Sequence, residues 1–247
     1  MTRTHNRWPS RRRPSHHPRR PARRLRRRSV RRHRGAAALT LAEVSPPVAL
    51  PGTPLLRVAL RVAIIAAVVA AVTVVAVTSE RGVWWRLITF TYQANLLAAC
   101  YYLWTLVAPR ADARAGLRGA VVLYVVIAGV VWNLFLTGHS MGYTPANLLL
   151  HVVVPVLALT DWLLVGRGTA KVPWWQPFAW LGYPAGYLVL ALLVLNRFGR
   201  RAPYYFLDPA AVGAANVAVN VAGLAACVLA LGYVLLAAHR AAAAAQD

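Results

Sequence analysis

The feature that most constrains this chain is a series of apolar stretches, each about 20 residues long, that recur between residues 57 and 238. A helix of roughly 20 apolar residues is long enough to cross the ~30 Å hydrocarbon core of a bilayer. Backbone polar groups in lipid must be satisfied within the structure, which favours helices here over strands. The sequence therefore predicts an all-α fold, a bundle of six transmembrane helices. These span about 57–78, 87–107, 119–137, 145–165, 177–196 and 212–238.

The charge of the chain is unevenly distributed. The 247 residues are 59% hydrophobic and carry a net charge of +22, but fifteen of the 28 Lys and Arg residues lie within residues 1–34. This segment has no apolar period, so it buries too little surface to offset the entropy of ordering and is expected to be disordered. We therefore divide the chain into an Arg-rich tail with a Pro/Ala linker (1–54), a six-helix transmembrane domain (55–240) and a short C-terminal tail (241–247).

Three interpretations of residues 1–34 remain open. The first is a cytoplasmic tail that contacts anionic lipid headgroups. The second is a nucleic-acid-binding arm, which we consider unlikely because no base-reading motif accompanies the arginines. The third is a mis-assigned gene start, since Arg outnumbers Lys by 27 to 1, a bias typical of GC-rich bacterial genes. The Lys and Arg residues outside the tail favour one orientation, with the N- and C-termini cytoplasmic in a bacterial plasma (inner) membrane.

Polar side chains within the expected helices gather at one depth. When each helix is placed in alternating direction, all seven fall in the same leaflet, and six of them form three pairs at i,i+4 spacing, each pair on one helix face. Polar groups in hydrocarbon are unfavourable unless they face partners or water. We therefore predict one shared polar pocket, with hydrogen bonding between helices as the alternative use of the same side chains. The seven residues are Thr91, Asn95, Asn133, Asn147, His151, Asn216 and Asn220.

His151 is the residue in this set with the most chemistry, because a neutral imidazole can act as a general base. Asp161 follows ten residues later, about 15 Å along a helix axis, so it cannot orient His151 as the acid of a triad would. We expect Asp161 to pair with Arg167 or Lys171 near the inner face. No metal site is expected, because no His, Cys, Asp or Glu cluster has ligand spacing, and no cofactor motif is present.

Several short motifs, in order along successive helices, resemble the bacterial branch of the androgen-induced, FAR-17a-like membrane proteins. The resemblance covers roughly residues 58–236. The motifs are "FTYQANLL" (90–97), "NLLLHVVVPVLALTDWLL" (147–164), "YPAGY" (183–187) and "APYYFLDP" (202–209).

The resemblance implies a catalytic site. Animal members of the family hydrolyse fatty acid esters of hydroxy fatty acids with an intramembrane Thr nucleophile and a His base. Thr91 in "FTY" matches the nucleophile, with Thr89 in "ITF" as a rival. Asn147 and His151 match the ends of the family's Asn-His-x-x-His motif, whereas Leu148 replaces its first histidine.

Three functional hypotheses follow. The first is an intramembrane lipid-ester hydrolase in which Thr91 attacks and His151 takes the proton. Its oxyanion or pocket support is expected from the polar residues Asn95, Asn133, Asn147, Asn216 and Asn220. The second is a non-catalytic membrane regulator, or a lipid- or partner-binding protein, in which the polar residues of the pocket only hydrogen-bond the helices to one another. The third, a small transporter, is disfavoured because the membrane segments carry few charges and no inverted repeat is evident. Membrane lipids are the expected partners.

Overall fold

The computed structural model describes residues 53–79, 83–138, 142–165, 172–195 and 204–244. The chain divides into two compact units, residues 1–47 and 48–247, and all described residues lie in the second. The predictions for the Arg-rich tail therefore fall outside the described residues, as do Arg167 and Lys171.

Every regular element in the described ranges is helical, which confirms the all-α prediction for this part of the chain. The principal helices of the first half are α1 (Thr53–Thr78), α2 (Trp84–Leu87), α3 (Phe90–Val107) and α4 (Ala115–Val131). A 3-10 turn, η1 (Pro109–Ala113), links α3 to α4, and a π-helical turn, η2 (Trp132–Leu136), extends α4. The next rod consists of α5 (Pro145–Leu148), the π turn η3 (Leu149–Val153), α6 (Val154–Thr160) and the π turn η4 (Asp161–Val165). The remaining elements are α7 (Gln176–Trp180), α8 (Gly182–Val189), η5 (Leu190–Leu195), η6 (Tyr205–Leu207), α9 (Pro209–Val212) and α10 (Ala214–Ala244).

Within the described ranges, four helical segments are long and apolar enough to cross a membrane. They are Pro54–Thr78, Ala115–Leu136, Pro145–Val165 and Ala214–Ala241, which is compatible with an integral membrane protein. The expected second helix is shorter than predicted, because the chain turns at Ile88 and Thr89 before α3 begins. The expected fifth helix falls in α7, α8 and η5, with an interruption at Leu181. The count of six crossings stays a prediction.

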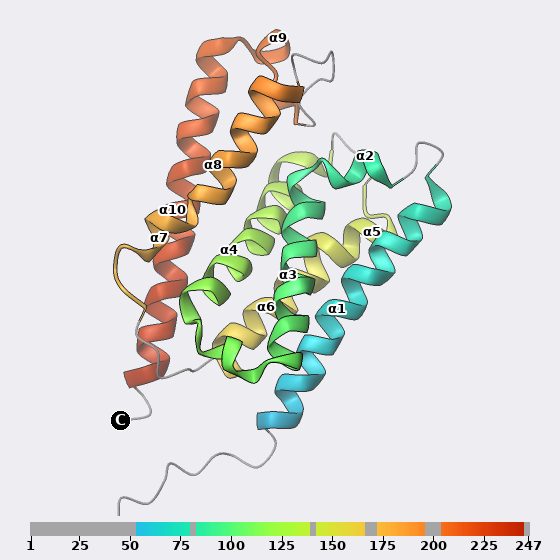
Figure 1. Ribbon diagram of the computed structural model, residues 1–247. Coiled ribbons are helices and arrows are strands. Elements are labelled where there is room, and N and C mark those ends of the chain that lie inside the picture. Colours follow the sequence, from blue (N-terminus) through green and yellow to red (C-terminus); the bar gives the residue numbers. More distant parts are fainter. Residues whose placement is uncertain (1–52, 80–82, 139–141, 166–171, 196–203, 245–247) are drawn as a thin grey trace, which may run out of the picture. The chain divides into compact units, whose positions relative to one another are not determined.

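Four helical segments form a closed ring of neighbours. α1 packs on α3, α3 on α4, α4 on α6, and α6 back on α1 (Figure 1). α4 is the central helix, since α7 and α10 also pack against it. Trp180 of α7 lies so close to α4 that a Cβ added at Gly119 would approach its ring to 2.5 Å. The Trp180 indole N–H donates to the Gly116 carbonyl at 2.8 Å, which fixes this contact.

The π turn η3 has a local cause in the sequence. In a regular α-helix the His151 carbonyl would accept a hydrogen bond from the N–H of residue 155, but that residue is proline and has no N–H. The ladder therefore shifts to the wider π spacing over Leu149–Val153, a pattern that recurs at functional sites in helices. The shift leaves the His151 carbonyl available to partners from neighbouring helices.

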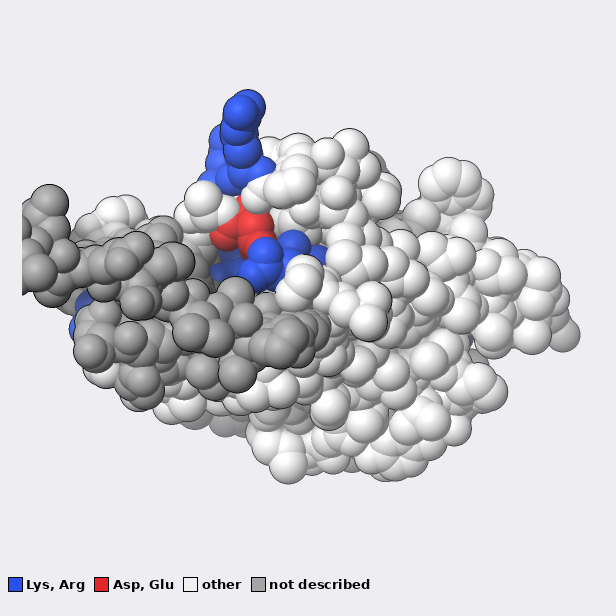
Figure 2. Space-filling view, turned by 90° about the horizontal axis from the view of Figure 1, so that it is seen from below, with Lys and Arg blue, Asp and Glu red and all other residues white. Residues whose placement is uncertain are grey.

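An ion-pair network joins α1, η1, α4 and η4 at the end of the helix ring away from η3. Asp112 in η1 accepts from Arg61 of α1 at 2.7 Å and from Arg118 of α4 at 3.0 Å, and Arg61 also reaches Asp161 at 3.3 Å. Figure 2 shows this charge as a red centre flanked by blue on a face whose other described surface is mostly white. Asp161 is fully buried. Its partner among the described residues is Arg61 of the first helix, while the pairing expected with Arg167 or Lys171 lies outside the described residues.

Candidate functional site

Thr91 and His151 meet between two helical rods. Thr91 lies in the first turn of α3 and His151 in the π turn η3, and His151 Nε2 is 3.2 Å from Thr91 Oγ1. Both side chains are more than nine-tenths buried. Sixty residues separate them in the sequence. The structure therefore brings together two of the seven polar residues that depth and spacing had grouped, and they are the two that the resemblance pairs as nucleophile and base.

The second ring nitrogen of His151 fixes the proton arrangement. Nδ1 lies 2.9 Å from the Asn147 carbonyl oxygen, which can only accept a hydrogen bond. In the neutral imidazole the Nδ1 atom therefore carries the hydrogen and Nε2 presents a lone pair. The Thr91 hydroxyl is then the donor to Nε2. This is the arrangement that a general base requires next to a hydroxyl nucleophile.

Several contacts hold the His151 ring and backbone in place. The Trp132 ring stacks on the imidazole with centroids 4.3 Å apart and planes at 22°. The Asn133 amide donates to the His151 carbonyl at 3.3 Å. A Cβ added at Gly129 would lie 2.7 Å from that same carbonyl, so only glycine lets α4 approach η3 this closely. These packing and backbone contacts orient His151, a role that a carboxylate has in a catalytic triad.

Three of the five predicted pocket asparagines have amides that donate to backbone carbonyls near the Thr91–His151 pair. Asn95 donates to the Thr91 carbonyl at 2.8 Å and to the Leu150 carbonyl at 3.4 Å. Asn133 donates within its own helix to Gly129 at 2.7 Å, in addition to its bond with His151. Asn147 donates to the Gly142 carbonyl at 2.8 Å. These side chains join helices and turns around the pair, and each amide nitrogen already donates to at least one backbone carbonyl.

The structure does not bring Asn216 and Asn220 into this cluster. Asn216 is exposed on α10 and donates to the Val212 carbonyl of the preceding turn at 2.8 Å. Asn220 donates to the Phe206 carbonyl at 2.9 Å and so anchors the segment before α9. Thr89, the rival nucleophile, donates to the Arg86 carbonyl at 2.8 Å.

A polar chamber opens beside the Thr91–His151 pair. It has a volume of about 320 Å³. Its lining includes His151, Asn147, Trp132, Tyr204 and one cation, Arg86. A chamber of this size holds several water molecules, each of which occupies ~30 Å³ in the liquid.

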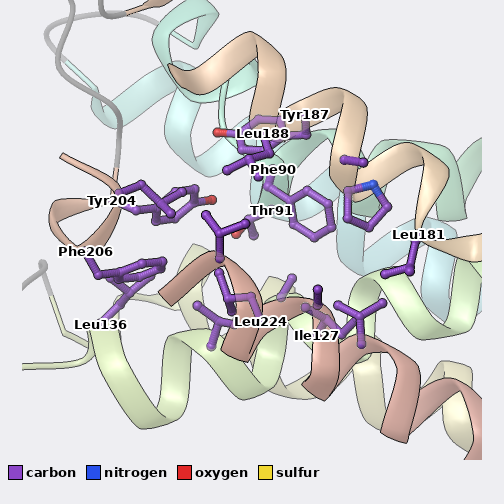
Figure 3. Close-up of a pocket in the computed structure, with 18 residues that line it drawn as sticks. Phe90, Thr91, Ile127, Leu136, Leu181, Tyr187, Leu188, Tyr204, Phe206 and Leu224 are labelled. Atoms are coloured by element: carbon purple, nitrogen blue, oxygen red, sulfur yellow. The ribbon is translucent and has the colours of Figure 1, made fainter. Parts of the chain in front are cut away.

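An apolar chamber lies on the other side of Thr91. It has a volume of about 240 Å³ and is lined mainly by aliphatic and aromatic side chains from α3, α4, α8 and α10. Figure 3 shows Thr91 at its centre, with Phe90 beside it and Tyr204 facing it. Thr91, Leu136 and Tyr204 line both chambers. The Thr91 hydroxyl therefore lies where a space suited to hydrocarbon meets a space suited to water.

Sequence reasoning missed three residues of this site, namely Trp132, Arg86 and Tyr204. Trp132 and Arg86 looked like ordinary members of a membrane helix and its flank. The aromatic run "APYYFLDP" was a signal for Tyr204, although no spacing rule connected it to Thr91. Asp208, at the end of that run, accepts from the Ala210 N–H and caps α9. Among the described residues, no group of three His, Cys, Asp or Glu side chains is arranged to hold a metal ion.

Comparisons with known protein families, with curated proteins and with solved structures found no match. The functional argument therefore depends on the geometry of the site and on the sequence motifs.

Proposed function

We propose that this chain is an integral membrane hydrolase of lipid esters, with Thr91 as nucleophile and His151 as general base. The observation that carries the proposal is the 3.2 Å contact between Thr91 Oγ1 and His151 Nε2 at the wall shared by the two chambers. The acyl chain would occupy the apolar chamber, and water would reach the acyl-enzyme through the polar chamber. The resemblance to the FAR-17a-like proteins supports the same pair.

The reaction has two balanced halves. As Thr91 Oγ1 bonds to the ester carbonyl carbon, its proton passes to His151 Nε2 and the carbonyl oxygen becomes an oxyanion. When the oxyanion collapses, the bond to the alkoxy oxygen breaks and His151 returns the proton to the departing alcohol. Water from the polar chamber then attacks the acyl-Thr91 ester and gives a proton to His151. The bond between the acyl carbon and Thr91 Oγ1 breaks, His151 returns the proton to Thr91 Oγ1, and the fatty acid is released.

We further propose six membrane crossings with both termini cytoplasmic, in the plasma membrane of a bacterium. Four apolar helices support the membrane assignment, and the two remaining crossings would be α3 and the α7–α8–η5 segment. In this topology the Thr91–His151 pair faces the outer leaflet and the Arg61–Asp161 network the inner one. A reporter fused at residue 140 should then read as external, and a cytoplasmic signal would reverse the orientation.

A non-catalytic lipid-binding or regulatory protein is the second candidate. The amides of Asn95, Asn133 and Asn220 all donate to backbone carbonyls, which is a structural use of intramembrane polar groups. This candidate predicts that lipid fills the apolar chamber without turnover.

The test is ester hydrolysis by the purified protein in nanodiscs, with p-nitrophenyl esters of increasing acyl length. Thr91→Val and His151→Ala should each lower turnover by at least about 1,000-fold, as loss of a nucleophile or base does in hydrolases. Thr160→Val is the matched control, because the Thr160 hydroxyl donates to the Val156 carbonyl of its own helix and Thr160 is outside the described lining of both chambers. Thr89→Val should retain turnover if Thr91, and not Thr89, is the nucleophile.

A second experiment locates the nucleophile directly. A fluorophosphonate adduct located by mass spectrometry should be found on Thr91. Folded wild-type protein that shows neither an adduct nor turnover would favour the lipid-binding candidate.

A further inference from the structure

An ester hydrolase needs hydrogen-bond donors for the oxyanion, and the asparagine amides are poorly placed to supply them. Asn95 and Asn133 each donate to two backbone carbonyls, and Asn147 is bonded to the Gly142 carbonyl. A donor that leaves such a bond during the reaction loses much of what it gains. The oxyanion donor must therefore be sought elsewhere around Thr91.

The first turn of α3 presents backbone donors beside the nucleophile. α3 begins at Phe90, and the first N–H that bonds to a carbonyl at i−4 is that of Gln93, to Thr89 at 3.2 Å. The N–H groups of Phe90, Thr91 and Tyr92 therefore have no acceptor within the helix. The positive end of the helix dipole also lies here, which favours negative charge at this point.

Tyr204 supplies a hydroxyl at the same place. Figure 3 shows its phenol oxygen directed at Thr91, and Tyr204 lines both chambers. Burial raises the pKa of Tyr204 above its ordinary value of 10.0, and the Thr91 hydroxyl, the Thr91 N–H, the Tyr187 hydroxyl and the Phe90 N–H act in the opposite direction. The hydroxyl therefore keeps its hydrogen at neutral pH and remains a donor.

We infer that Tyr204 is a catalytic residue that donates its hydroxyl hydrogen to the oxyanion, at the N-terminal end of α3. The inference rests on the proposed hydrolase function. In the resting site the Tyr204 hydroxyl lies beside the Thr91 and Tyr187 hydroxyls. When Thr91 Oγ1 becomes bonded to the acyl carbon, the new negative charge lies on the oxygen attached to that carbon, one bond further along. Tyr204 then needs only a small rotation of its O–H bond to follow the charge.

The electrostatic surroundings of the Tyr204 hydroxyl make it a stronger hydrogen-bond donor than an isolated tyrosine. The positive end of the α3 dipole and its N–H groups lie on the oxygen side of the phenol and polarise its O–H bond. One of the two chambers that Tyr204 lines is apolar, and on that side the interaction with the oxyanion is weakly screened. No proton is transferred from Tyr204, since the oxyanion collapses before protonation and the leaving alkoxide is protonated by His151.

The experiment compares Tyr204→Phe with the wild type in kinetics and in inhibitor binding. The substitution keeps the ring that packs on Phe206, with centroids 5.6 Å apart, and removes only the hydroxyl. Loss of one oxyanion donor should lower kcat by about 100-fold to 1,000-fold and leave KM nearly unchanged. Tyr233→Phe is the matched control, because Tyr233 is on α10, packs on Phe178 and lies outside both chambers. A thermal melt checks that both variants remain folded.

A pair of ketones separates a catalytic role from a structural one. In an alkyl trifluoromethyl ketone, Thr91 Oγ1 adds to the carbonyl carbon and an oxyanion forms. The alkyl methyl ketone of the same chain length binds without this addition. Tyr204→Phe should weaken inhibition by the trifluoromethyl ketone about 100-fold and leave binding of the methyl ketone unchanged.

The outcomes are separable. If the wild type hydrolyses esters and Tyr204→Phe does so with equal kcat, or if the variant weakens both ketones alike, the role of Tyr204 is refuted while the hydrolase function stands. If the folded wild type neither hydrolyses an ester nor adds to the trifluoromethyl ketone, both proposals fail together.

Discussion

Gly129 controls how closely α4 approaches the histidine, and its replacement by alanine gives a quantitative prediction. The added Cβ would lie 2.7 Å from the His151 carbonyl oxygen and 3.1 Å from Pro155 Cγ. Ordinary contact begins near 3.4 Å, so the His151 backbone must retreat by about 0.7 Å. A backbone oxygen within a helix cannot move alone. The whole π turn shifts and carries the imidazole away from Thr91.

Two quantities should change in the Gly129→Ala variant. Overpacking of this kind destabilises by about 1–3 kcal/mol, partly offset by the ~1 kcal/mol advantage of Ala over Gly in a helix. A displacement that approaches 1 Å at the reacting groups lowers the rate by up to about 100-fold. We therefore expect a modest loss of stability and a loss of turnover of about 10-fold to 100-fold at equal folded fraction.

Gly119→Ala is the matched control. It lies on the same helix, and its Cβ would approach the Trp180 ring to 2.5 Å, so it introduces comparable crowding without contact with η3. Both variants are measured by thermal melting in detergent, by p-nitrophenyl ester hydrolysis and by the rate of fluorophosphonate addition at Thr91. Equal turnover and equal labelling rates in the two variants would refute the argument that Gly129 positions His151.

Two more predictions concern other parts of the molecule. Asp161→Asn removes one buried partner of Arg61 and should lower the free energy of unfolding by about 3 kcal/mol. The melting temperature in micelles should fall accordingly, and an unchanged melting temperature would contradict this account of the network. Ala225→Phe places a ring in the apolar chamber and should raise KM for long-chain esters on the order of tenfold, while KM for short-chain esters stays unchanged. Kinetics with esters of increasing chain length measure this difference. A uniform effect on all chain lengths would mean that the chamber does not hold the acyl group.

The sequence predicted the helical class, the main apolar helices and a shared polar pocket that includes Thr91 and His151. These predictions follow from apolar length and from i,i+4 spacing, which are local properties, whereas the pairing of Thr91 with His151 was implied by the resemblance to the FAR-17a-like proteins. Helix breaks were harder to predict, because the turn at Ile88 and Thr89 lies within an apolar run without glycine or proline. The π turn at His151 was also missed, although Pro155 is its cause and is visible in the sequence.

The finer roles of the polar residues could not be read from spacing alone. Depth placed all the asparagines in one leaflet, but rotation about each helix axis decides whether a side chain faces the bundle or the outside. Asn216 faces outward, and Asn133 turns its amide back to its own helix. Tyr204 enters the site from a connecting segment, whose path depends on tertiary packing such as the Asn220–Phe206 bond.

The Arg61–Asp161 bond also has a consequence for biosynthesis. One hundred residues separate the two partners, and even Asp112 follows Arg61 by 51 residues. At about 5–20 residues per second, a ribosome takes roughly 5–20 s to add the residues between Arg61 and its deepest counter-ion. Until η1 has been made, the Arg61 side chain has neither of these partners and must be solvated by water, lipid headgroups or the insertion machinery. Its ion pair with Asp112 can form next, and its ion pair with Asp161 can form only after η4 has been made.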